Sequence, residues 1–112
     1  MLYIWGVNCE QGRDKELQDW YVKNKKILQK EVPKGVKFVG IFAPGMGIGS
    51  RDLYIVHEIG SYGDLDRIRD WQTPEAMRVW GELADFAAPG GGETMILREA
   101  GDWVIPPKKK PE

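Results

Sequence analysis

The stretch from residue 53 to residue 86 constrains the fold of this chain more than any other. It opens with Leu-Tyr-Ile-Val-His-Glu-Ile, a short apolar run that is typical of a strand. Ser61, with Asp64 three residues later, then resembles the start signal of a helix. That helix is interrupted at Thr73-Pro74, where a capping residue precedes a proline that suits the first helical position. The stretch therefore predicts a strand over 53–59 followed by a helix that is broken once.

The rest of the chain adds three strands and one helix to this unit. Short apolar segments predict strands over 2–9, 36–43 and 93–99. Apolar residues at spacings of three and four predict a helix over 14–32, with Asp14 as its N-cap. The order βαββαβ indicates an α+β fold, in which a four-stranded antiparallel sheet carries two helices on one face. This is the ferredoxin-like plan.

Length and composition bound the class of protein. The 112 residues suffice for one domain, which we assign to 1–105, with 106–112 as a charged tail. Sixteen basic and seventeen acidic residues nearly cancel, so nothing predicts a nucleic-acid partner. We also expect no membrane partner, because no apolar run is long enough to span a bilayer. A single cysteine and the lack of a signal-peptide pattern favour a cytoplasmic location.

The strands are apolar on both faces, whereas two helices can cover only one. An uncovered apolar sheet face is an association surface. We therefore predict a homodimer, sheet against sheet, with the small-molecule cavity in the space between the two sheets or, alternatively, between the sheet and the helices. The five tryptophans of the chain favour an aromatic ligand wherever they line that cavity.

Three features together resemble the dimeric α+β barrel superfamily: the βαββαβ order, the run Glu16-Leu-Gln-Asp-Trp-Tyr, and the strand–Ser61–broken-helix unit. That superfamily holds EthD-like proteins, antibiotic-biosynthesis-type monooxygenases, stress-responsive barrel proteins and haem-degrading monooxygenases. The acid–histidine pair of EthD-like chains is replaced here by Asn24 and Lys25.

The chain is similar to the haem-degrading members at Asn8 and Trp71. Their histidine ligand would fall near Trp80 and Gly81, so the resemblance implies no haem ligand and we expect no cofactor. The cofactor-free members imply a cavity with an Asn, a Trp and a base, which Asn8, Trp71 and His57 would supply.

The candidate catalytic residues are thus His57 and Asn8. His57 is the sole histidine, and it acts either as a general base or as a core residue bonded to a neighbour. One histidine and one cysteine do not form a metal site, and none is expected. The candidate ligand-binding residues are Trp71, Trp5, Arg98, Met46 and Ile48.

Two of these assignments have alternatives. Arg98 would instead form a cross-strand ion pair with Glu58. Met46 and Ile48 belong to a glycine-rich loop over 44–50, which lacks the following helix that a phosphate-binding loop requires. The loop is then a hairpin connection whose apolar side chains cover a pocket mouth or pack on a partner subunit.

The leading functional prediction is binding and turnover of a small apolar or aromatic molecule, as a cofactor-free monooxygenase or isomerase. A non-catalytic binding or assembly protein is the alternative, and haem binding or degradation comes third.

Overall fold

The structure is a computed structural model that describes residues 1–47, 49–90 and 92–102. Within these residues there are four strands and three α-helices. The strands are β1 (Leu2–Val7), β2 (Lys37–Phe42), β3 (Leu53–Glu58) and β4 (Glu93–Leu97). The helices are α1 (Asp14–Lys30), α2 (Gly63–Arg69) and α3 (Pro74–Phe86), and short 3-10 turns lie at Gly45–Gly47 and Ala100–Asp102. The predicted element order is confirmed, and the broken helix is α2 followed by α3.

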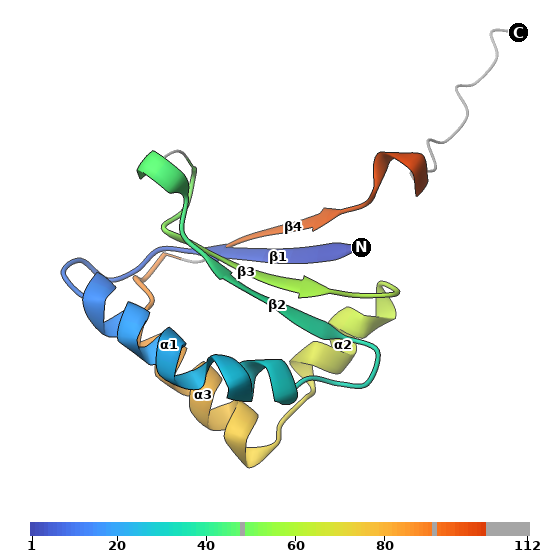
Figure 1. The fold of residues 1–112 in the computed structure, drawn as a ribbon, viewed down its shortest axis with the longest axis horizontal. Coiled ribbons are helices and arrows are strands. Elements are labelled where there is room, and N and C mark those ends of the chain that lie inside the picture. Colours follow the sequence, from blue (N-terminus) through green and yellow to red (C-terminus); the bar gives the residue numbers. More distant parts are fainter. Residues whose placement is uncertain (48, 91, 103–112) are drawn as a thin grey trace, which may run out of the picture.

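The strands form one antiparallel sheet in the order β2-β3-β1-β4 (Figure 1). The α+β class and the four-stranded antiparallel sheet are therefore confirmed, and this arrangement is compatible with a ferredoxin-like fold. Because β1 lies between β3 and β4, Arg98 and Glu58 do not lie on neighbouring strands. These two residues are therefore not direct cross-strand neighbours.

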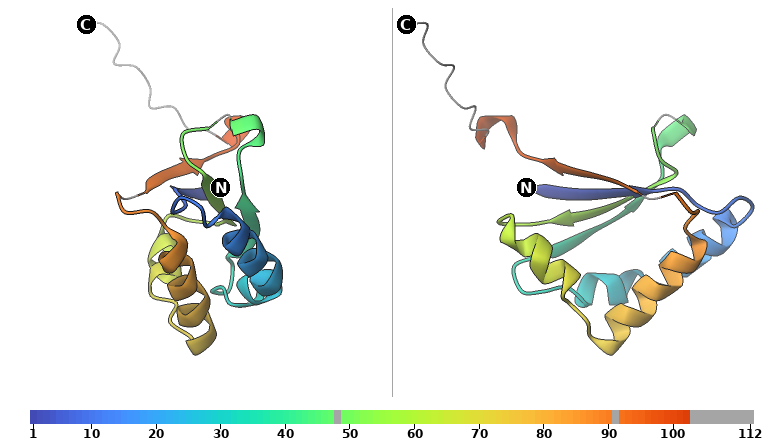
Figure 2. Two further views of the ribbon diagram at one scale, coloured as in Figure 1. Left: turned by 90° about the vertical axis from the view of Figure 1, so that its left-hand side faces the viewer. Right: turned by 180° about the vertical axis from the view of Figure 1, so that it is seen from behind.

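The helices pack on one face of the sheet, as Figure 2 shows from two further directions. Alternation along the strands directs one set of side chains toward these helices. Phe38 and Ile55 from the sheet join Leu28, Val79 and further buried side chains of α1 and α3 in one core. That core holds the two layers together, because burial of apolar surface is the main stabilising term.

Helix α1 begins at Asp14 itself, so the prediction of Asp14 as N-cap is wrong. Arg13 occupies the cap position and makes no side-chain cap bond there. Asn24, the polar residue of the apolar stripe, is fully buried, and its Nδ2 donates to the Trp20 carbonyl at 2.9 Å. Buried polar groups are normally bonded in this way, so Asn24 is a structural residue.

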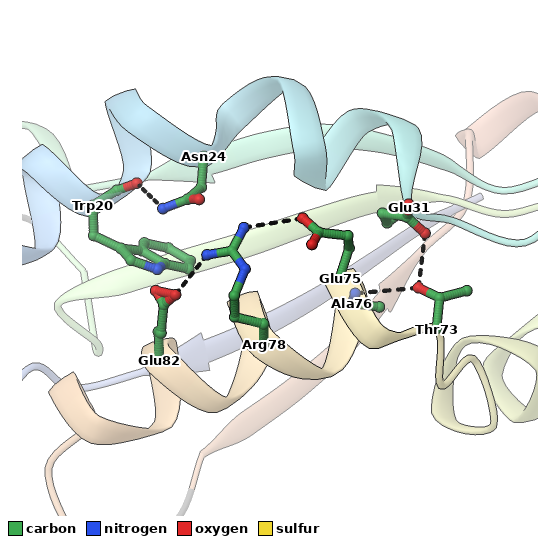
Figure 3. A network of polar contacts seen from close by, with 8 residues as sticks. All are labelled: Trp20, Asn24, Glu31, Thr73, Glu75, Ala76, Arg78 and Glu82. Carbon is green, nitrogen blue, oxygen red and sulfur yellow. Dashed lines mark hydrogen bonds and ion pairs between the residues drawn. The ribbon is translucent and has the colours of Figure 1, made fainter.

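At the predicted helix break, Thr73 both caps α3 and bonds to the end of α1. Thr73 is the N-cap of α3, and its Oγ1 accepts from the Ala76 amide at 3.1 Å. The same hydroxyl donates to Glu31 at the end of α1, at 2.7 Å (Figure 3). Thr73 thus satisfies a free amide of α3 and ties it to α1.

Helix α2 lacks the predicted Ser61 side-chain cap, and Tyr62 occupies the cap position. Asp64, the second residue of the expected capping motif, does accept hydrogen bonds from backbone amides. Asp64 Oδ2 accepts from the amides of Gly60 at 2.8 Å and Ser61 at 3.2 Å, and its Oδ1 accepts from Arg67 at 2.7 Å. The carboxylate therefore holds the turn between β3 and α2.

The second sheet face carries no described helix (Figure 2). The strand register places Leu2, Ile4, Val56, Met95 and Leu97 on this outer face. Phe42, opposite Tyr54 at the β2 edge, is half exposed, and Leu97 is 48% exposed. An apolar surface of this kind is what the sequence predicts for a face that associates.

Several element boundaries differ from the prediction by one or two residues. β1 ends at Val7, and Cys9 makes only an isolated bridge with Ala87. β4 ends at Leu97 rather than at residue 99. The expected extended segment 103–105 and the tail 106–112 lie outside the described residues.

Candidate functional site

A cavity of about 380 Å³ lies between the helix-facing side of the sheet and helices α2 and α3. Its sheet wall comes from alternate positions of the two central strands, Tyr3 and Trp5 of β1 with Ile55 and His57 of β3. Its helix wall is mostly apolar and is formed by Leu65, Ile68, Arg69, Trp71, Ala76, Met77 and Trp80. Ligand sites are commonly concave, largely apolar and supplied with a few polar groups.

His57 is the polar group in the sheet wall, and it is only 4% exposed. Aromatic rings surround its imidazole. Tyr3 stacks on it with ring centroids 6.2 Å apart, and Phe38 and Trp80 follow at 5.4 and 6.0 Å. These neighbours exclude water from the imidazole without bonding to its nitrogens.

The Nδ1 atom of His57 is buried and has no hydrogen-bond partner among the described residues. Burial lowers the pKa of His57 to about 4, because the charged imidazolium would lose its hydration. The ring is therefore neutral at pH 7, with one nitrogen that donates and one that accepts. A buried polar atom without a partner is costly, and Nδ1, which is closed off from solvent, carries this cost in the folded protein.

Trp71 and Trp5 both line the same cavity as His57, so three of the predicted site residues converge. Trp71 lies in the connection between α2 and α3, and its amide donates to the Ile68 carbonyl at 3.2 Å. Its side chain is 36% exposed, which places it at the mouth of the cavity. The helix break thus positions an aromatic side chain where a ligand would enter.

Asn8 lies elsewhere. It follows β1, and its Oδ1 accepts from the Asp52 amide at 3.1 Å while its carbonyl accepts from the Ala88 amide at 2.8 Å. Asn8 is not among the described residues that line the cavity. Its contacts hold two connecting segments to the end of β1, so the structure does not bring Asn8 and His57 together.

Two further predicted residues, Arg98 and Met46, lie away from this cavity. Arg98 follows β4 and is not part of the described lining. Met46 is 96% exposed and has a left-handed backbone, with φ of 57°. Ile48 lies outside the described residues. Arg98 and Met46 are therefore not among the described residues that line this cavity.

Sequence reasoning missed Tyr3, Trp80 and Met77 as cavity residues. For two of them, the sequence contained a pattern that predicts their position. Tyr3 shares its strand face with Trp5, so alternation would have placed the two side by side. Trp80 belongs to the apolar stripe of α3, which must face the sheet.

A second cavity, of about 560 Å³, lies near the other end of the sheet, between α1 and the segment 43–53. Pro44, Gly49 and Ser50 of the glycine-rich loop line it, together with Asp14, Asp52 and Cys9. Burial and the nearby Asp14 raise the pKa of the Cys9 thiol to about 11. Cys9 is therefore a protonated, unreactive thiol at neutral pH.

No group of three or more potential metal ligands gathers among the described residues. None of the described helices is both long and apolar enough to cross a membrane.

No protein-family model and no solved structure matches this chain. The chain is similar to a segment of DNA-directed RNA polymerase III subunit rpc3 from Emericella nidulans, with 31% identity over 86 residues. The aligned segment covers 74% of this chain but only 13% of that subunit. The likeness therefore concerns a short part of a much longer protein.

Proposed function

We propose that this chain is a ferredoxin-like α+β barrel protein that binds a small apolar or aromatic molecule in the cavity between the sheet and helices α2 and α3. One observation carries the proposal: the buried imidazole of His57, whose Nδ1 has no partner among the described residues, lies in the wall of a cavity otherwise lined mostly by aromatic and aliphatic side chains. Aromatic walls favour a flat ligand, and the imidazole would fix its orientation.

The protein would act as a homodimer joined through the outer sheet face. Leu2, Met95 and Leu97 belong to this face and are exposed in a single chain. Burial of such side chains in a second copy stabilises a dimer in proportion to the apolar area removed from water. The proposed cavity lies on the opposite side of the sheet, so dimerisation would leave its entrance open.

Catalytic turnover of the bound molecule has less support from the site than binding does. A pKa of about 4 makes His57 a weak base, so a hydrogen-bonding role suits it better than proton abstraction at neutral pH. A cofactor-free monooxygenase or isomerase would then use the cavity mainly to bind and polarise its substrate.

Equilibrium dialysis against naphthalene at pH 7 tests the binding proposal. We expect saturable binding that weakens about tenfold or more in Trp71→Ala, because this change removes an aromatic wall. Met46→Ala is the control, since Met46 is exposed and lies outside the cavity lining. Absence of saturable binding, or equal loss in both variants, would contradict the proposal.

The likeness to rpc3 favours a second candidate, a non-catalytic module of a larger assembly. In this case the outer sheet face would contact other subunits instead of a second copy. Co-sedimentation with purified RNA polymerase III of Emericella nidulans tests it. Binding that Leu97→Lys abolishes would support the module, whereas no co-sedimentation of the unmodified chain would exclude this assembly.

A further inference from the structure

The two edge strands of the sheet, β2 and β4, differ in how readily a further strand could pair with them (Figure 1). An edge strand has backbone N–H and C=O groups that point away from the sheet and can bond to another strand. Proteins commonly block such an edge with a bulge, a charged residue, a proline or a covering side chain.

The edge at β2 is blocked in three ways. The register of β2 shifts between Phe38 and Gly40, and an irregularity of this kind disturbs the ladder. The amide of Ile41 already donates to the hydroxyl of Tyr21, from α1, at 3.2 Å. The strand also begins with an exposed lysine, Lys37. A further strand would therefore find neither a regular ladder nor all of the amides that it needs.

The edge at β4 has none of these features. All five residues of β4 pair with β1 in one uninterrupted register. No backbone hydrogen bond joins β4 to a segment other than β1 among the described residues. Thr94 faces the helices, Met95 and Leu97 face the other way, and all three are exposed. Within the described residues, this edge is thus open on both sides of the sheet.

The sequence of β4 suits pairing with a second copy of the same strand. Full antiparallel overlap of two copies is centred on Met95. Thr94 then lies opposite Ile96 of the partner subunit. Glu93 lies opposite an uncharged leucine, Leu97 of the partner subunit, so no two like charges meet across the pair.

Glu93, the one charged residue of β4, is compensated within its own chain. Its carboxylate accepts from Ser50 Oγ at 2.7 Å and lies 3.6 Å from Arg51 Nε. The other four residues of the strand are uncharged. Pairing of two β4 strands therefore leaves no unpaired charge at the contact.

We propose that β4 is a self-association surface, at which two copies pair antiparallel about a two-fold axis between their Met95 residues. The two sheets then form one eight-stranded sheet, with the helices of both copies on the same face. Their outer faces remain free, so this contact can coexist with the outer-face dimer proposed above. One five-residue strand offers less surface than a sheet face, so the edge contact is weaker and forms at higher protein concentration.

Cysteine pairs distinguish this contact from the outer-face dimer. Thr94→Cys and Ile96→Cys proteins, both in a Cys9→Ala background, are mixed under mild oxidation. Directly opposite residues of an antiparallel pair have Cα atoms about 4.5–5.5 Å apart, which suits a disulfide. Both positions face the helices, so contact through the outer faces does not bring them together.

The matched control mixes Thr94→Cys with Val39→Cys, because Val39 is exposed on the other edge strand, β2. The disulfide between positions 94 and 96 should form at least about tenfold faster than this control, since pairing raises the local concentration of the two thiols. Equal rates for the two mixtures would overturn the proposal.

Amide hydrogen exchange tests the same contact in the unmodified chain. The outward amides of β4 should exchange about tenfold more slowly when the protein concentration is raised from about 10 μM to about 1 mM. Contact through the outer faces adds no backbone hydrogen bond and gives no such change. Exchange that is independent of concentration would overturn the proposal, either as fast exchange from a free edge or as slow exchange from an edge that the same chain covers.

Discussion

The imidazole of His57 and the ring of Phe38 meet edge to face, with centroids 5.4 Å apart and planes at 67°. The two residues lie directly opposite each other on β3 and β2. Phe38 is itself buried and is not among the described residues that line the cavity, so this contact helps to exclude water from the imidazole. The pairing explains why a titratable side chain stays uncharged in the sheet.

Stability should fall as the pH decreases through the range in which the folded and unfolded chains differ at His57. Its pKa is about 4 when folded and 6.5 when free, because burial disfavours the charged ring. The unfolded chain therefore binds more protons between pH 6.5 and 4, and the free energy of unfolding decreases by about 3 kcal/mol across this window. Urea unfolding at a series of pH values measures the decrease. In His57→Phe this part of the pH dependence should vanish, and an unchanged profile would contradict the assignment.

Loss of the Thr73 hydroxyl should destabilise the protein through two helices. Thr73→Ala removes the cap of α3 and the bond to Glu31, at a cost of about 1–2 kcal/mol. Thr73→Ser is the matched control, because it keeps the hydroxyl. Chemical denaturation should place the serine variant close to the unmodified protein. Equal losses in both variants would show that the methyl group, and not the hydroxyl, matters.

Asp64 and Asp66 lie in the same helix and pair with arginines, yet their replacement should have different effects. Asp64 is buried and accepts from two backbone amides, whereas Asp66 makes only an exposed pair with Arg69. Asp64→Ala should lower the melting temperature by roughly 5–10 °C, because the amides of Gly60 and Ser61 lose their acceptor. Asp66→Ala should change it by less than about 2 °C. Thermal unfolding followed by circular dichroism compares the two, and similar shifts would contradict this account.

The oligomeric state should respond to the outer sheet face and not to the helices. Leu97→Lys would bury a charge in the proposed interface and weaken dimerisation by about a hundredfold. Val22→Lys is the control, because Val22 is 73% exposed on α1, away from that face. Sedimentation equilibrium should give a dimer for the unmodified chain and for Val22→Lys, and a monomer for Leu97→Lys. A monomeric unmodified chain would remove the dimer from the proposal.

Much of the fold followed from local patterns. Alternation, helical spacing and the Thr73-Pro74 break were sufficient for the element order and for the cap of α3. These features depend on residues within a few positions of one another. The N-caps of α1 and α2 were exceptions: neither Asp14 nor Ser61 holds the cap position, and an acidic side chain able to cap also suits the first helical turn.

The composition of the site was decided by tertiary structure. Asn8, Arg98 and Met46 share polar or apolar character with true cavity residues, and no local pattern separated them. Both faces of β1 are apolar, so the sequence by itself determined that Tyr3, Trp5 and Val7 share one face but not which face meets the helices. Only the packing of α2 and α3 against β1 and β3 brought His57, Trp5 and Trp71 around one cavity. The physical reason is that a strand's period of two specifies which side chains point the same way, whereas the burial of that face depends on contacts between elements far apart in the chain.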